Sequence, residues 1–151
     1  MSSQRIPYRA LFADSGTDWK KRRGGQCDIV SWDERKLQRA VVRSGPSVCE
    51  LNNRLYAVGG HDGPTVQTSG EVFSPETGTW QRIADLNVKR RNAGLLAHDG
   101  FLYIIGGEDG ENNLTSIEKY DPTANTWSIL PSHLTTGRSY AGVAIIERSF
   151  I

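Results

Sequence analysis

Apolar residues gather in short runs through the middle of the chain, and glycine, asparagine, aspartate or proline bounds each run. No run follows the helical period of 3.6 residues, whereas short apolar runs between turn residues are typical of β-strands. The dipeptides Asn52-Asn53 and Asp99-Gly100 suit the positive φ angles of two-residue hairpin turns. The pattern therefore predicts strands at residues 47–51, 55–58, 70–73, 80–83, 93–98, 102–105, 117–120 and 127–130.

The predicted strands belong to two copies of one sequence pattern. Tyr103 follows Tyr56 by 47 residues, and Trp127 follows Trp80 by the same interval. The pairs Gly59-Gly60 and Gly106-Gly107, Glu71 and Glu118, and Pro75 and Pro122 keep the same register. Repeats of 20–50 residues are typical of solenoids and propellers. Because each copy holds four predicted strands, we expect four-stranded antiparallel blades.

The spacing of glycine and aromatic residues resembles a known repeat. A double glycine follows an apolar strand, an aromatic residue (Phe73 or Tyr120) comes 14 residues after its first glycine, and a tryptophan comes 7 residues later. This pattern resembles the kelch repeat, and is most similar to the kelch domains of Kelch-like (BTB-kelch) adaptor proteins. The resemblance implies an all-β, partial kelch β-propeller with two complete four-stranded antiparallel blades and partial flanking blades.

The resemblance divides the chain into two regions. Residues 1–26 do not match the repeat, and we expect this segment to be disordered. Trp32 lies 11 residues before Arg43, as Trp127 lies 11 before Arg138, which indicates the last strand of a preceding blade at 29–32. Residues 138–146 resemble the first strand of a following blade. The kelch region then comprises a partial blade at 27–42, blades at 43–89 and 90–137, and the start of the next at 138–151.

The number of blades leaves three alternatives open. Propellers need about 4–8 blades to close, and open edge strands promote association. The chain is then a truncated or spliced product of a longer protein, a fragment, or one member of a ring completed by self-association through open blade edges. We favour truncation or splicing, because the sequence stops inside a repeat.

Composition and charge exclude several partner classes. The formal net charge of +1 gives no field that favours nucleic acid or an anionic membrane. No segment has the apolar length of a membrane span or of a secretory signal. Two cysteines, Cys27 and Cys49, make no disulfide framework, which favours a reducing compartment. We therefore expect a cytoplasmic protein, with the basic run Lys20–Arg23 as the argument for the nucleus as an alternative.

Three arginines precede the predicted first strands, and the propeller would bring them to one face. The resemblance implies that this face binds a partner peptide, and guanidinium groups would suit an acidic one. The alternative is that each arginine pairs with a carboxylate of its own blade. His61, Asp62, Glu108 and Asp109 follow the double glycines on loops that would share this rim. The predicted partner-binding residues are Arg43, Ser44, Arg90, Asn92, Arg138, Ser139 and Tyr140.

The remaining repeated residues predict structure rather than chemistry. We expect Phe73, Tyr120, Trp80 and Trp127 to pack between blades, and the repeated glutamates Glu71 and Glu118 to form structural hydrogen bonds. The three histidines occupy unrelated repeat positions, and neither cysteine has a partner at metal-ligand spacing. No nucleophile or phosphate-binding motif occurs. We therefore expect no enzyme activity, no metal and no cofactor.

The function expected from the resemblance is recognition of a protein or peptide ligand. The closest model is the substrate-recognition domain of an adaptor for cullin-RING ubiquitin ligases. No stretch resembles the BTB and BACK domains, so we expect this chain alone to compete for a substrate rather than to recruit a ligase. The alternatives are an actin-binding, cytoskeletal kelch protein and a truncated product without independent function.

Overall fold

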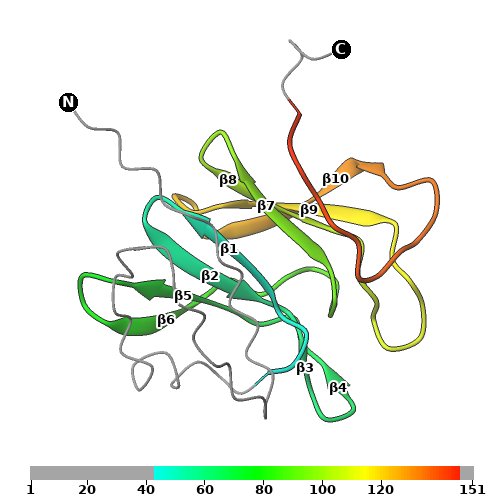
Figure 1. Cartoon of the computed structure of the whole chain (residues 1–151), viewed down its shortest axis with the longest axis horizontal. Helices are drawn as coiled ribbons and strands as arrows, with labels where there is room; N and C mark the ends of the chain where they lie inside the picture. The colour runs from blue at the N-terminus through cyan, green and yellow to red at the C-terminus, as the bar shows by residue number, and fades with distance from the viewer. Residues whose placement is uncertain (1–42, 147–151) are drawn as a thin grey trace, which may run out of the picture. The chain divides into compact units, whose positions relative to one another are not determined.

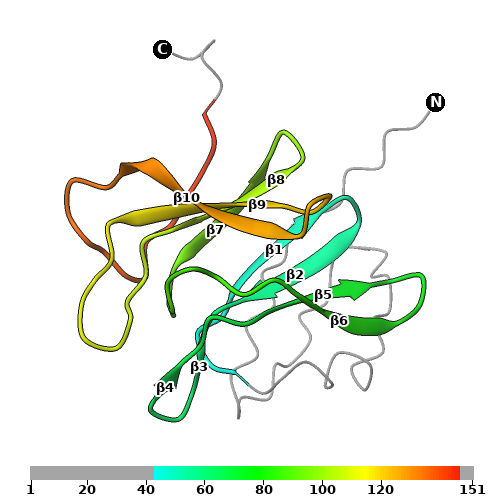
Figure 2. The same cartoon turned by 180° about the vertical axis from the view of Figure 1, so that it is seen from behind.

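The computed structural model describes residues 43–146, which lie within one compact unit of the chain. The predictions for residues 1–26, for the partial blade at 27–42, for the basic run Lys20–Arg23 and for Cys27 lie outside the described residues. The described part contains ten β-strands and no helix (Figures 1 and 2).

Eight of these strands form two four-stranded antiparallel sheets, and each sheet is one blade. In the first blade, neighbouring strands are consecutive apart from an intervening hairpin: β1 (Ser47–Leu51), β2 (Arg54–Val58), β5 (Gly70–Ser74) and β6 (Thr79–Ile83). The second blade repeats this order: β7 (Gly94–His98), β8 (Phe101–Ile105), β9 (Ser116–Asp121) and β10 (Thr126–His133). The all-β fold and the four strands of each blade are confirmed.

The two predicted hairpin turns are also confirmed. Asn52 and Asn53 have φ angles of 54° and 59°, and Asp99 and Gly100 have 48° and 80°. Two successive positive φ angles give the turn a twist that matches the strands on either side. These turns fix the registers, with Leu51 opposite Arg54 and His98 opposite Phe101.

The double glycines allow the next blade to approach closely. Gly59 and Gly106 have φ angles of 66° and 64°, in the left-handed region that other residues rarely adopt. A Cβ atom at Gly59 would overlap the carbonyl oxygen of Arg90, and one at Gly106 would overlap the carbonyl of Arg138. Glycine is therefore needed at these positions for two reasons: it adopts the backbone angles of the turn, and it leaves room for the backbone of the following repeat.

The core lies between the two blades. Val58 from the first blade and Leu102 and Ile104 from the second are fully buried. The ring of Tyr120 packs edge-on to Tyr56, with 6.0 Å between the centroids, and lies 4.9 Å from Trp127. Burying apolar area between the sheets stabilises their association by about 25 cal/mol per Å². The predicted packing role of Tyr120 and Trp127 is confirmed.

Polar atoms of the same aromatic residues also bond across the blades. The Trp127 indole N–H donates to the carbonyl of Ala84 at 3.1 Å. The Tyr120 hydroxyl donates to Asn125 Oδ1 at 2.8 Å, and that oxygen also accepts the amide of Ala84. Burial disfavours the phenolate and raises the pKa of Tyr120 to about 12. The polar atom of each aromatic residue thus has a hydrogen-bond partner while the ring fills the core.

The structure differs from the predicted strands in two places. A short hairpin of β3 (His61–Asp62) and β4 (Thr65–Val66) projects from the first blade where we expected only a loop. The predicted first strand at 138–146 is not formed, because no described strand lies beside it to complete a hydrogen-bonded ladder. Val143 nevertheless packs against Gly94 at the start of β7.

Replacing Gly59 with alanine tests the close approach. We expect Gly59→Ala to lower the free energy of unfolding by about 3 kcal/mol, since it combines left-handed strain with overpacking. Gly63→Ala is the matched control, because Gly63 has a φ angle of 55° but open space around it. It should cost only about 1 kcal/mol. Urea denaturation of both variants checks the difference, and equal losses would show that the contact with Arg90 is unimportant.

Candidate functional site: the loop face

Arg90 lies inside the protein rather than on a partner-binding rim. Its side chain is fully buried, and one terminal nitrogen donates to the carbonyls of Gly106 at 2.8 Å and Ser116 at 3.2 Å. The other donates to the Ser116 hydroxyl and pairs with Glu118 at 2.7 Å. The guanidinium therefore ties the double glycine to the third strand of its own blade.

Arg43 makes the same contacts in the first blade. It donates to the carbonyls of Gly59 at 2.9 Å and Ser69 at 2.7 Å, and pairs with Glu71 at 3.2 Å. Only 3% of its side chain is exposed. For Arg43 and Arg90 the prediction of partner binding is wrong, because buried guanidinium groups cannot reach a ligand. The alternative, pairing with a carboxylate of the same blade, is correct for both.

Glu118 joins the second blade to the linker that precedes it. Besides Arg90, its carboxylate accepts the amides of Asn87 at 2.9 Å and Val88 at 3.1 Å, and the side-chain amide of Asn87 at 2.9 Å. Burial lowers the pKa of Arg90, and the charge of Glu118 opposes this shift. A buried charge needs such compensation to remain ionised. The structural hydrogen bonds predicted for Glu118 are confirmed.

The other predicted residues lie near a row of equivalent backbone positions. The amide of Asn92 donates to the carbonyl of Gly45 at 3.0 Å, and the amide of Tyr140 donates to the carbonyl of Asn92 at 2.9 Å. All three residues have φ angles between 54° and 59°. Ser44 lies beside this row and exchanges backbone hydrogen bonds with His61. The row therefore gathers residues from successive repeats.

The side chains along this row are polar and partly accessible. Glu108 accepts hydrogen bonds from Arg91 Nε at 3.1 Å and Asn92 Nδ2 at 2.9 Å. Tyr140 is 79% exposed, and Arg138 is also exposed. Arg91 was missed by sequence reasoning, because Ser44 and Ser139 occupy its position in the neighbouring repeats. The signal that could have identified Arg91 was its place in the sequence, between the predicted site residues Arg90 and Asn92.

Two loops extend this surface. The β3–β4 hairpin and the loop between β8 and β9 lie on the same side of the molecule (Figure 1). They border a hollow of about 320 Å³, which Asp109 and Lys89 also line. Asp109 Oδ1 accepts the amides of Asn112 and Glu111, and these bonds lower the pKa of its carboxyl group. We call this surface the loop face: residues 44–45, 59–69, 91–92, 106–115 and 139–140.

The described residues give no sign of a metal centre or of a membrane span. In that part of the chain, no three His, Cys, Asp or Glu side chains gather where they could hold a metal ion. No helix there is long and apolar enough to cross a membrane.

Comparison with known proteins agrees with the repeat seen in the structure. The family model described as Kelch motif matches residues 43–87 and 89–134, one match in each blade. The chain belongs to the kelch-repeat family. Kelch repeats form modules that bind other proteins, and the partial propeller described above is such a module.

Curated relatives share only short segments with this kelch chain. Kelch-like protein 4 of Homo sapiens is 39% identical over 54 residues, which cover 36% of this chain and 8% of the relative. An F-box/kelch-repeat protein of Arabidopsis thaliana is 33% identical over 64 residues, covering 42% and 17%. Kelch repeat-containing protein kel-10 of Caenorhabditis elegans is 34% identical over 66 residues, covering 44% and 11%. The chain thus spans less than a fifth of these relatives.

The buried ion pair predicts that Arg90 affects stability rather than binding. Arg90→Met should lower the free energy of unfolding by about 3–5 kcal/mol, because it leaves Glu118 buried without its counter-ion. Arg138→Met should change it by less than about 0.5 kcal/mol, since Arg138 is exposed. Urea denaturation measures both, and a stable Arg90→Met variant would contradict the structural role.

Proposed function

We propose that this kelch chain recognises a protein partner through the loop face. The observation that supports this is the row of Gly45, Asn92 and Tyr140, in which successive repeats bring polar and aromatic groups to one surface. Exposed tyrosine is favoured at interfaces, because it offers apolar area and a hydroxyl group with few rotatable bonds. The partner is a peptide or protein segment that packs on Tyr140 and hydrogen-bonds to the polar groups beside it.

Fewer arginines are available to bind an acidic partner than the sequence predicted. Arg43 and Arg90 are buried, and Arg91 is already paired with Glu108. The exposed guanidinium of Arg138 remains available beside Ser139 and Tyr140. We propose that the partner offers one carboxylate or hydroxyl group here rather than a strongly acidic stretch.

We further propose that recognition serves a ubiquitin ligase adaptor system in the cytoplasm, with the nucleus as the alternative. Relatives named Kelch-like protein 4 and Kelch repeat and BTB domain-containing protein support this proposal. The adaptor role assigns this chain the recognition step, and an excess of the chain would then compete for the same substrate.

Selection from a random peptide display library against the full chain tests the loop face. Enriched peptides should bind the wild-type chain, and Asn92→Gly combined with Tyr140→Gly should weaken them about tenfold or more. Glycine suits the positive φ angles of both positions and already occupies the equivalent Gly45, so the fold should persist. Glu76→Ala, an exposed change at the β5–β6 turn, is the control and should bind normally. Equal binding by all three proteins would overturn the proposal.

A further inference from the structure

Three Asp-Gly pairs lie in turns of the two blades, and Asp-Gly is the dipeptide in which an aspartate isomerises most readily. They are Asp62-Gly63, Asp99-Gly100 and Asp109-Gly110. In this reaction the glycine nitrogen attacks the carboxyl carbon of the aspartate side chain, and glycine favours the attack because it has no side chain in the way. Since the dipeptide is the same at all three places, the surroundings of each pair decide which of them reacts.

Asp109 is held by the loop between β8 and β9. Its Oδ1 accepts the amides of Glu111 and Asn112, each at 2.8 Å, and these bonds lower the pKa of its carboxyl group. The amide of Asp109 also donates to the carbonyl of Asn112 at 3.1 Å. Both bonds to Oδ1 must break before the carboxyl carbon can turn toward the nitrogen of Gly110. The loop therefore protects Asp109 from isomerisation.

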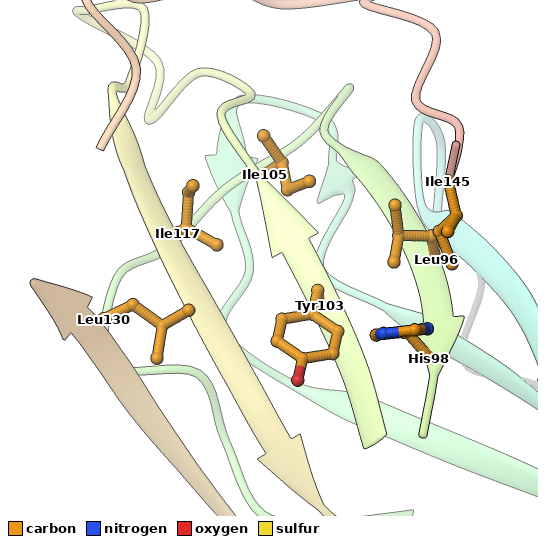
Figure 3. Close-up of a pocket in the computed structure, with 7 residues that line it drawn as sticks. All are labelled: Leu96, His98, Tyr103, Ile105, Ile117, Leu130 and Ile145. Atoms are coloured by element: carbon orange, nitrogen blue, oxygen red, sulfur yellow. The ribbon is translucent and has the colours of Figure 1, made fainter. Parts of the chain in front are cut away.

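Asp99 is restrained by the strands on either side of it. Its turn closes the β7–β8 hairpin, which five residue pairs hold in register. Asp99 Oδ2 lies 3.2 Å from His98 Nε2, and the ring of His98 lies 6.5 Å from that of Tyr103, as the close-up of this part of the blade shows (Figure 3). Attack by the Gly100 nitrogen requires the backbone of the turn to rotate, and this long hairpin resists the rotation.

Asp62 lacks both kinds of restraint. Its side chain is exposed and, among the described residues, makes no hydrogen bond or ion pair. The β3–β4 hairpin has two residue pairs, His61–Val66 and Asp62–Thr65, and so short a two-stranded hairpin is marginally stable. The hydrogen bond between His61 Nδ1 and the Gly63 carbonyl, at 2.8 Å, does not involve the Asp62 side chain.

The space around Gly63 also favours the reaction at Asp62. A Cβ atom placed on Gly63 would meet no other atom within 4 Å, whereas one on Gly110 would lie 3.3 Å from Val66 Cγ2. The carboxyl carbon of Asp62 and the nitrogen of Gly63 can therefore meet through a local opening of the hairpin. The blade itself need not unfold, because such openings cost less than global unfolding.

We propose that Asp62-Gly63 is a site of spontaneous isoaspartate formation on the loop face. The Gly63 nitrogen bonds to the side-chain carboxyl carbon of Asp62, and its hydrogen leaves with the acid hydroxyl as water, which gives a five-membered imide. Water then cleaves the imide at the former main-chain carbonyl of Asp62. The main chain now runs through the side-chain carbon, and the former carbonyl becomes a free carboxylate. Mass and charge are those of the original chain.

The product has a longer main chain within the β3–β4 hairpin. Asp62 can then no longer face Thr65 in the observed register. The change stays local, because the amide of Gln67 donates to the carbonyl of Gly60 at 2.9 Å and closes the base of the hairpin. Thr65 and Val66 line the hollow of the loop face, so isomerisation reshapes that surface while the blades stay folded. The reaction needs no partner, and the inference does not rest on the proposed function.

Incubation of the full chain at physiological temperature and neutral pH tests the proposal. Trypsin then releases residues 55–82 with Asp62, and residues 92–119 with Asp99 and Asp109. Chromatography separates the aspartyl and isoaspartyl peptides, and electron-transfer fragmentation locates the isoaspartate. We expect it to form at Asp62 faster than at Asp99, and at least about tenfold faster than at Asp109, where two hydrogen bonds must break. In guanidinium chloride the three rates should converge, since unfolding removes the difference in surroundings.

Asp62→Glu is the matched control, because glutamate keeps the charge but would have to close a six-membered ring. Isomerisation within residues 55–82 should then fall to background. The isolated isoaspartyl chain should exchange the amide hydrogen of Thr65 faster, with no change in β8. Isomerisation at Asp99 or Asp109 as fast as at Asp62, or no faster at Asp62 than in Asp62→Glu, would overturn the proposal. Faster exchange throughout both blades would overturn the local effect.

Discussion

The buried ion pair between Arg90 and Glu118 is the interaction on which the rest of the two-blade structure depends. Arg90 fixes the double glycine and third strand of its own blade, while Glu118 holds the linker amides of Asn87 and Val88. The linker is thereby held against the second blade, and the carbonyl of Arg90 accepts a hydrogen bond from the amide of Gly60 in the first blade. This pair of side chains thus helps to hold the strands of the second blade together and also fixes the linker through which the two blades make contact.

This arrangement explains why single blades of this kind are incomplete. The indole of Trp127 finds its acceptor at Ala84, which belongs to the preceding repeat. The indole N–H of Trp80 is buried without a hydrogen-bond partner in the part of the chain that the structure describes. A buried polar group without a hydrogen-bond partner destabilises the fold. Each repeat therefore depends on its neighbour for hydrogen-bond partners as well as for apolar contacts.

Most of the fold could be predicted because the same structural features occur in both repeats, at equivalent positions. The Gly-Gly pairs, the hairpin turns and the apolar strands depend on local backbone sterics, and they appear twice in one register. The burial of Arg90 could not be predicted in this way, since arginine preceding a strand fits both an exposed rim and an internal ion pair. Which of the two holds depends on whether Glu118 lies close to Arg90 in the folded chain, and the sequence does not give that distance. The strand at 138–146 was mispredicted for a related reason, because strand formation needs a partner as well as a suitable sequence.

The central claim is that the Arg90–Glu118 pair makes the two blades one cooperative unit, and native-state hydrogen exchange tests it most directly. The account predicts that the amides of Asn87 and Val88 exchange only through global unfolding, with the same free energy as amides in β2 and β8. Exchange of Asn87 and Val88 at the rate of an exposed loop would contradict it. A difference of more than about 2 kcal/mol between β2 and β8 would contradict it equally, because the blades would then unfold separately.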